Sequence, residues 1–213
     1  MADLKYRFVI FDFDGTLANT LWWAARQMPA IAARYGTRQV DPDEYDHIRT
    51  LSPDALLSYL NIPRWKMPLI MWEMRRRMRR ETGTLFLFPG IAGVLLELAN
   101  AGVQLAVLSS NAERNIRAVL GPQSEPLISH YLCGVSFFGK KGKLEKLLGR
   151  AAADPADVLF IGDELRDLEA AKAAGVAFGA ASWGLNSKET FARHSPFRIF
   201  TRPEEISREV LSG

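Results

Sequence analysis

Apolar runs and amphipathic helical patterns alternate along most of the chain. Three short runs rich in β-branched or aromatic residues are each followed by polar or glycine residues and then by a helical pattern; they are Arg7–Phe11, Gln104–Leu108 and Val158–Ile161. Uninterrupted apolar runs are typical of strands that are buried on both faces. Their alternation with helices predicts a parallel sheet with right-handed crossovers, whose functional groups gather at the carboxyl ends of the strands. Weaker strands are expected at Cys133–Phe138, Val176–Ala180 and Arg198–Phe200.

The chain from Thr20 to about Leu87 has a different pattern and contains no convincing strand. Apolar residues recur there at helical spacing, and glycine and several prolines separate the helical stretches. Helices are expected at Leu21–Tyr35, Pro42–Leu51, Pro53–Leu60 and Trp65–Thr82. The sequence therefore predicts an all-helical insert between the first strand and the rest of the sheet, which we call the helical segment (residues 20–87).

One helix of this segment is rich in arginine. Met71, Met74 and Met78 lie at helical spacing within it, which indicates that one side of the helix is buried. We interpret the arginines from Arg75 to Arg80 as its solvated side rather than as an anion or nucleic-acid site.

Composition narrows the class of protein. The 213 residues suffice for one α/β domain with a smaller appended domain, and 48% hydrophobic residues support a real core. The 27 basic residues nearly balance the 24 acidic ones, so no nucleic-acid partner is expected. The single cysteine, Cys133, excludes an internal disulfide framework and fits a reducing compartment. No apolar run approaches the roughly 20 residues of a membrane span, so we expect a cytoplasmic protein with no membrane partner.

The first candidate site follows the first predicted strand. Asp12 and Asp14 are two residues apart, and Gly15 lets the backbone turn sharply away. A carboxylate at the end of a strand can attack phosphorus, and a second one nearby can serve as acid and base. The same residues also suit a capped loop, and they resemble the start of a calcium-binding loop. The calcium loop is disfavoured because Thr16 and Leu17 follow where further oxygen ligands would be needed.

Two further candidates carry hydroxyl and ammonium groups. Ser109 and Ser110 end the second strong strand just before a helix expected to begin at about Ala112, a position that suits either a bound phosphate or simple helix capping. A basic run follows later and contains Lys140 and Lys143. By itself such a run is more typical of a solvated loop than of a phosphate site.

The fourth candidate follows the third strong strand. Asp163, Glu164 and Asp167 lie within five residues there. Carboxylates so close together repel one another unless a cation neutralises them, which favours a metal site. The alternative is that Glu164 and Asp167 are first-turn helix acids favoured by the helix dipole.

Taken in order, these four segments resemble the four motifs of the haloacid dehalogenase superfamily. The resemblance spans nearly the whole chain, and the helical insert with the return at Phe88-Pro89-Gly90 looks most like the phosphoglycolate phosphatase-like branch. It implies a Rossmann-like three-layer α/β/α core with a parallel sheet, formed by residues 1–19 and 88–213. It also implies that residues 20–87 form an all-helical cap domain inserted after the first strand.

The resemblance also implies roles for the site residues. Asp12 would form an aspartyl-phosphate, and Asp14 would protonate the leaving oxygen and then activate water. Mg²⁺ would be held by Asp12, the backbone carbonyl of Asp14 and Asp163. Ser109, Ser110 and a lysine would grip the phosphoryl oxygens. The remaining acids, Glu164 and Asp167, would support the shell around the metal.

The identity of the lysine is left open, because family members commonly have proline after it and this chain does not. Lys140 fits the expected Gly-Lys pair best, and Lys143 is the alternative. The presence of Asp14 argues for phosphate chemistry, since dehalogenases usually lack this second acid.

The function expected from these residues is magnesium-dependent hydrolysis of a small phosphomonoester, with a small phosphorylated molecule as the partner. One alternative is a phosphomutase similar to β-phosphoglucomutase, which shares all four motifs. Another is a regulatory or interaction protein on the same scaffold that does not turn over. The sequence identifies neither the substrate nor the oligomeric state.

Overall fold

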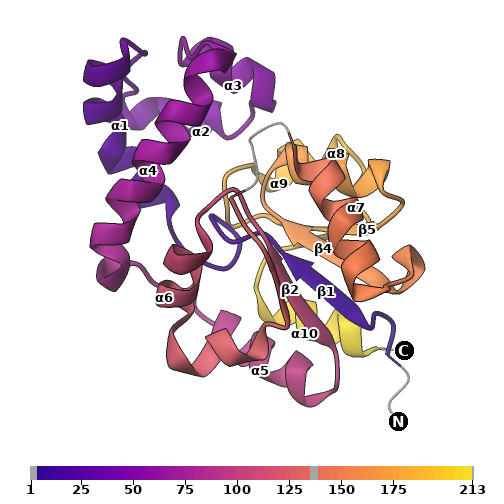
Figure 1. Cartoon of the computed structure of the whole chain (residues 1–213). Coiled ribbons are helices and arrows are strands. Elements are labelled where there is room, and N and C mark those ends of the chain that lie inside the picture. The colour runs from indigo at the N-terminus through magenta and orange to yellow at the C-terminus, as the bar shows by residue number, and fades with distance from the viewer. Residues whose placement is uncertain (1–3, 135–138, 213) are drawn as a thin grey trace.

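A six-stranded parallel sheet forms the centre of the protein in a computed structural model that describes residues 4–134 and 139–212 (Figure 1). The strands are β1 (Phe8–Phe11), β2 (Gln104–Leu108), β3 (His130–Leu132), β4 (Val158–Gly162), β5 (Ala177–Ala181) and β6 (Arg198–Phe200). Their order across the sheet is β3-β2-β1-β4-β5-β6, and every neighbouring pair is parallel. Val9 of the central strand lies opposite Leu105 and Leu159. The α/β fold with a parallel sheet is thus confirmed.

Helices cover both faces of this sheet (Figure 1). The helices on the sheet are α5 (Ile91–Asn100), α6 (Glu113–Ser124), α7 (Lys140–Ala151), α8 (Leu165–Ala173), α9 (Lys188–Ala192) and α10 (Glu204–Leu211). The helical segment contains α1 (Leu21–Tyr35), α2 (Tyr45–Ile48), α3 (Pro53–Tyr59) and α4 (Met67–Glu81). Short 3₁₀ helices lie at Pro42–Glu44, Arg64–Lys66, Thr82–Thr84, Glu125–Leu127 and Pro155–Asp157. Over the described ranges, no helix combines the length and the apolar character that spanning a membrane requires.

Side chains of β1 alternate between two apolar clusters. Val9 and Phe11 pack with residues of α5, α6 and α10 on one face of the sheet. Phe8 and Ile10 pack with residues of α7 and α8 on the other face. All four side chains are buried, as expected of a strand covered on both sides. The core is therefore a three-layer α/β/α arrangement.

The order of the strands places a switch in direction at β1. After β1 the chain adds β2 and β3 on one side, and then crosses to add β4, β5 and β6 on the other side. In open parallel sheets, ligands bind outside the carboxyl ends of the strands at such a switch. The residues that follow β1, β2 and β4 are therefore the ones in position for chemistry.

Helices α1 to α4 stand beside this end of the sheet (Figure 1). Helices α1, α3 and α4 share an apolar cluster that includes Ile31, Leu57 and Ile70 and is separate from the two clusters of the sheet. The connections into and out of the helical segment run side by side, since Asn19 N–H donates to the Phe86 carbonyl at 2.9 Å. This arrangement agrees with the expected all-helical insert between β1 and the rest of the sheet.

Two expected elements differ from the structure. The helix expected over Pro42–Leu51 is a 3₁₀ turn followed by the short α2; residues 49–51 leave the helix and are held by Asn186, whose side chain donates to the carbonyls of Arg49 and Leu51. The strand expected at Cys133–Phe138 is replaced by β3, which ends at Leu132. Residues 135–138 of that expectation lie outside the described residues.

Candidate active site

Three buried carboxylates meet at the carboxyl end of the sheet. Asp12 follows β1, Asp163 follows β4, and Asp167 lies in the first turn of α8. One oxygen of each lies within 4.8 Å of the others, and the three residues are at most 1% exposed. We call these residues the acidic cluster. Their carboxylate oxygens are the hard ligands that Mg²⁺ prefers in proteins.

The electrostatics of the acidic cluster also favour a bound cation. Burial raises the pKa of Asp163 well above its usual value, and the charges of Glu164 and Asp12 add to this rise. Burial likewise raises the pKa of Asp167 to about 7, although the nearby Lys140 opposes the shift. A cation among these groups would stabilise their ionised forms, so the donor set fits the magnesium that the sequence motifs implied.

Neighbouring residues fix the carboxylate of Asp163. Its Oδ1 accepts a hydrogen bond from the Thr16 hydroxyl at 2.8 Å, and its Oδ2 accepts one from the Leu185 amide at 2.8 Å. Gly15 passes so close that an added Cβ would lie 2.0 Å from Asp163 Oδ2, and its φ is +77°. Glycine is therefore required at this turn for two independent reasons, the backbone conformation and the lack of space.

Lys140 is the lysine that the structure brings to the acidic cluster. It is the first residue of α7 and is 4% exposed. Its Nζ lies 2.8 Å from Asp12 Oδ2, and it also forms an ion pair with Asp167. Burial lowers the pKa of this ammonium, but the two carboxylates outweigh burial and the net shift is upward. Lys143, one turn further along α7, is partly exposed.

Asp14 lies beside the acidic cluster and is partly exposed. Both of its carboxylate oxygens accept hydrogen bonds from Asn111 Nδ2, each at 3.1 Å. Burial and the charge of Asp12 raise the pKa of Asp14 to about 6. A carboxyl group with this pKa can both hold and release a proton near neutral pH, which is what an acid and base requires.

The two serines after β2 lie at the same end of the sheet. Ser109 is fully buried, and its Oγ accepts a hydrogen bond from the Asn111 amide at 3.0 Å. Ser110 lines a cavity above Asp14. The helix that follows begins at Glu113, one residue later than expected.

Glu164 and Arg166 form a second charged group at this cavity. Arg166 donates to both oxygens of Glu164, from Nε at 2.6 Å and from Nη2 at 2.8 Å. Burial lowers the pKa of Arg166, but the charges of Glu164 and Asp167 raise it by more. The sequence motifs do not single out Arg166, although its place among three acids indicates a compensating cation.

The helical segment supplies the other wall of the cavity, which has a volume of about 200 Å³. From the segment come Thr20, Leu21, Trp23, Ala24, Met71, Met74, Arg75 and Met78, which face Asp14, Ser110, Asn111, Glu164 and Arg166. The interpretation of the arginines as a solvated face is wrong for Arg75, which is partly buried and lines this cavity. Arg75 lies four residues after Met71 and three residues before Met78, so helical spacing already places it on the side of the methionines.

Comparison with known proteins identifies relatives over nearly the full length. A family model described as haloacid dehalogenase-like hydrolase matches residues 9–181. A phosphoglycolate phosphatase of Synechococcus elongatus is 30% identical over 203 residues, covering 95% of this chain and 96% of the relative. A phosphoglycolate phosphatase of Haemophilus influenzae is 26% identical, covering 92% and 94% of the two chains.

Solved structures share the fold. A protein of Lactobacillus plantarum, described as a candidate phosphoglycolate phosphatase, superposes with a TM-score of 0.79 and covers 96% of this chain and 99% of its own. At 23% sequence identity this likeness concerns the fold alone.

Proposed function

The chain belongs to the haloacid dehalogenase-like hydrolase family and is a phosphatase, and we propose that it hydrolyses a small phosphomonoester with Mg²⁺ through an aspartyl-phosphate on Asp12. The observation that carries this proposal is the contact of Asp12 with Lys140 inside the acidic cluster. A buried carboxylate held beside an ammonium and two further acids is suited to receive a phosphoryl group. Its relatives suggest a substrate similar to phosphoglycolate.

In the proposed reaction, an oxygen of Asp12 attacks phosphorus and the ester P–O bond breaks. Asp14 gives its proton to the leaving alcohol oxygen in the same step. Asp14 then takes a proton from water, the water oxygen attacks the aspartyl-phosphate, and inorganic phosphate leaves Asp12 free again. The pKa of Asp14, raised to about 6, supports this exchange of a proton in both directions.

The binding of phosphate and metal is assigned to separate groups. Lys140, Ser109 and Ser110 would hold the phosphoryl oxygens, with Lys140 preferred over Lys143 because of its contact with Asp12. Asp12, Asp163 and the backbone carbonyl of Asp14 would hold Mg²⁺. The other two acids, Glu164 and Asp167, would support its shell. When bound, Mg²⁺ offsets the negative charge shared by phosphate and carboxylates.

We assign residues 20–87 as a cap domain and residues 1–19 and 88–213 as the core domain. The separate apolar cluster of the helical segment supports this division, as do the paired connections at Asn19 and Phe86. The active site would then lie between the two domains, where the cavity above Asp14 receives side chains from both.

The test is release of inorganic phosphate from a panel of phosphorylated metabolites, with Mg²⁺ or with EDTA. We expect activity only with Mg²⁺, and its loss in Asp12→Asn, which keeps the size of the side chain. Thermal unfolding of Asp12→Asn controls for folding. Full magnesium-dependent activity of this variant would refute the proposal, and isomerisation of a sugar phosphate without phosphate release would favour a phosphomutase.

A further inference from the structure

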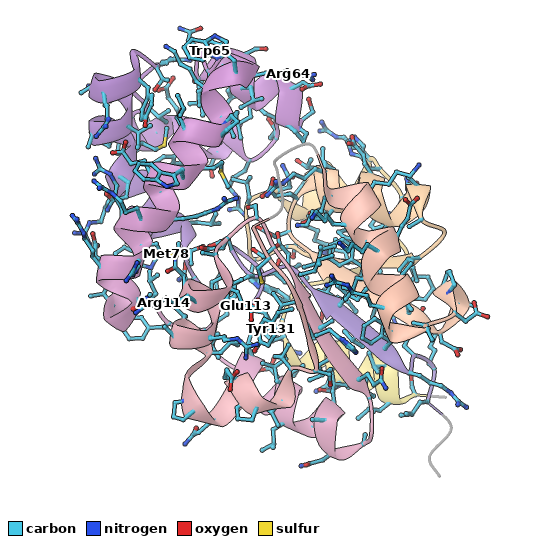
Figure 2. All side chains as sticks on the ribbon, viewed as in Figure 1. Arg64, Trp65, Met78, Glu113, Arg114 and Tyr131 are labelled. Carbon is cyan, nitrogen blue, oxygen red and sulfur yellow. The ribbon has the colours of Figure 1, made fainter. Side chains whose placement is uncertain are left out.

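Asn115 of α6 is a buried polar side chain between the helical segment and the loop that follows β2. It is 2% exposed, and its Nδ2 donates to the Arg75 carbonyl at 2.9 Å and to Asn111 Oδ1 at 3.1 Å. Arg75 belongs to α4, which passes beside α6 near Met78 (Figure 2). Asn111 lies between β2 and α6. Asn115 therefore joins the backbone of α4 to the loop that follows β2.

Backbone groups decide which way round the two asparagine amides stand. The Ala112 amide can only donate, and it donates to Asn111 at 2.7 Å, so the Asn111 atom at this point must be Oδ1. The Arg75 carbonyl can only accept, so the Asn115 atom that faces it must be Nδ2. Asn111 therefore turns its Oδ1 toward Asn115 and its Nδ2 toward Asp14.

Asn111 holds the carboxyl group of Asp14 from one side. Its Nδ2 donates to both oxygens of Asp14, each at 3.1 Å, and also to the sulfur of Met78 at 2.8 Å. A donor shared between the two oxygens fixes the direction in which the carboxyl group points. This direction matters because a general acid must lie within hydrogen-bond reach of the atom that it protonates.

Asn115 acts on this contact from behind. Asn115 is not among the residues that line the cavity above Asp14, whereas Asn111 is. Without Asn115, the Oδ1 of Asn111 keeps its hydrogen bond from the Ala112 amide, but nothing then holds the plane of its amide group from the side of α6. A misplacement of about 1 Å at a reacting group can cost about 100-fold in rate.

We propose that Asn115 is a positioning residue for the general acid: it holds Asn111, and through Asn111 it aims the carboxyl group of Asp14 at the leaving oxygen of the substrate. This inference rests on the proposed phosphatase function, in which Asp14 gives its proton to that oxygen. Because Asn115 is anchored on the Arg75 carbonyl, helix α4 takes part in placing the acid.

The experiment compares two phosphoryl donors that differ in their need for an acid, with Mg²⁺ present. One is phosphoglycolate, or whichever alkyl phosphomonoester the wild-type protein hydrolyses fastest, which loses an alcohol that must be protonated as it leaves. The other is acetyl phosphate, which loses acetate without a proton. The ratio kcat/KM covers the steps up to departure of this group, so it reports on the acid and not on the later attack of water.

Asn115→Ala should lower kcat/KM for the alkyl ester by about 10- to 100-fold and for acetyl phosphate by less than about threefold. The retained activity with acetyl phosphate shows that the variant is folded. Asn115→Ser keeps one donor for the two acceptors and should show a smaller loss of the same kind. In an Asn111→Ala background, Asn115→Ala should cause no further selective loss, because its effect passes through Asn111.

The matched control is Leu120→Ala, five residues further along α6 in an apolar cluster of the sheet. This variant should lower the midpoint of thermal unfolding but leave the ratio of the two kcat/KM values unchanged. A loss in Asn115→Ala that is equal for the two donors, or no loss with either, would overturn the inference. If the wild-type protein hydrolyses no phosphomonoester, the proposed function itself fails.

Discussion

Asn186 joins the helical segment to the loop that supports the acidic cluster, and we predict that Asn186→Ala destabilises the protein strongly. The side chain is 2% exposed. Its Oδ1 accepts a hydrogen bond from the Leu165 amide at 2.9 Å, where α8 begins. Its Nδ2 donates to the carbonyls of Arg49 at 2.9 Å and Leu51 at 3.3 Å. Its own backbone amide donates to the Asp163 carbonyl at 3.0 Å, so the same residue also contacts the end of β4, where the acidic cluster lies.

The magnitude follows from these contacts. Alanine leaves the buried amide of Leu165 without an acceptor, which costs about 1 to 3 kcal/mol. Two further neutral hydrogen bonds contribute about 0.5 to 1.5 kcal/mol each, the longer one least. The expected loss is therefore about 2 to 5 kcal/mol in the free energy of unfolding. For a chain of this length each kcal/mol lowers the midpoint of thermal unfolding by about 2 to 4 °C, so a fall of about 4 to 20 °C is expected.

The assay is thermal and urea unfolding of Asn186→Ala beside Asn100→Ala, an exposed asparagine at the end of α5. Asn186→Asp separates hydrogen bonding from packing, because it keeps the shape and the acceptor but loses the donors. Burial raises the pKa of a carboxyl group at this position, so the stability of Asn186→Asp should fall as pH rises through that raised pKa. If Asn186→Ala unfolds at the same temperature as Asn100→Ala, these hydrogen bonds do not join the segments.

Three further predictions concern the site. Both Gly15 and Gly36 have positive φ, but only Gly15 lies against the acidic cluster. Gly36→Ala should therefore cost roughly 1 kcal/mol in the free energy of unfolding, whereas Gly15→Ala should cost several times as much. Gly15→Ala should also abolish the stabilisation against heat that Mg²⁺ gives. Equal losses in the two variants would contradict the reasoning from space. Lys140→Met should lower phosphatase activity by about 100-fold or more, whereas Lys143→Met should change it little. The rate of phosphate release from each variant is the measurement, and a larger loss in Lys143→Met would contradict the prediction. Burial raises the pKa of the Cys133 thiol to about 12. Iodoacetamide should therefore alkylate Cys133 about a thousandfold more slowly at pH 8 than it alkylates a free thiol, and the rate should still rise toward pH 10. Alkylation as fast as that of glutathione would refute this prediction.

Much of the core could be predicted because the residues of each strand show by themselves that the strand is buried. Val9 and Phe11 face one layer and Phe8 and Ile10 the other, and a strand covered on both sides must be apolar at every position. The same logic placed chemistry after the strands, since parallel strands end together at one edge. Asp12 and Asp163 are accordingly brought together from distant parts of the chain.

Two predictions from the sequence were wrong where residues far away in the chain contact the segment concerned. The helix expected through Leu51 ends at Ile48, and Asn186, far away in sequence, holds the residues that follow through the carbonyls of Arg49 and Leu51. Arg75 was interpreted as solvated because a basic run on a helix usually is, but α6 covers that side of α4. The first outcome leaves no trace in the periodicity of the helix, whereas the spacing of Arg75 from Met71 and Met78 already placed it on the side of the methionines.

The sequence by itself determined the parallel sheet, the helical segment and the identity of the acids at the strand ends. Each of these can be inferred from the pattern of apolar and polar residues within a short stretch of chain. Only the tertiary structure decided that Lys140 rather than Lys143 meets Asp12, and that Arg75 faces Asp14. These choices depend on how a helix is rotated and docked against the end of the sheet. A shift of one turn exchanges one charged side chain for another, and packing between segments far apart in the chain selects which one is buried.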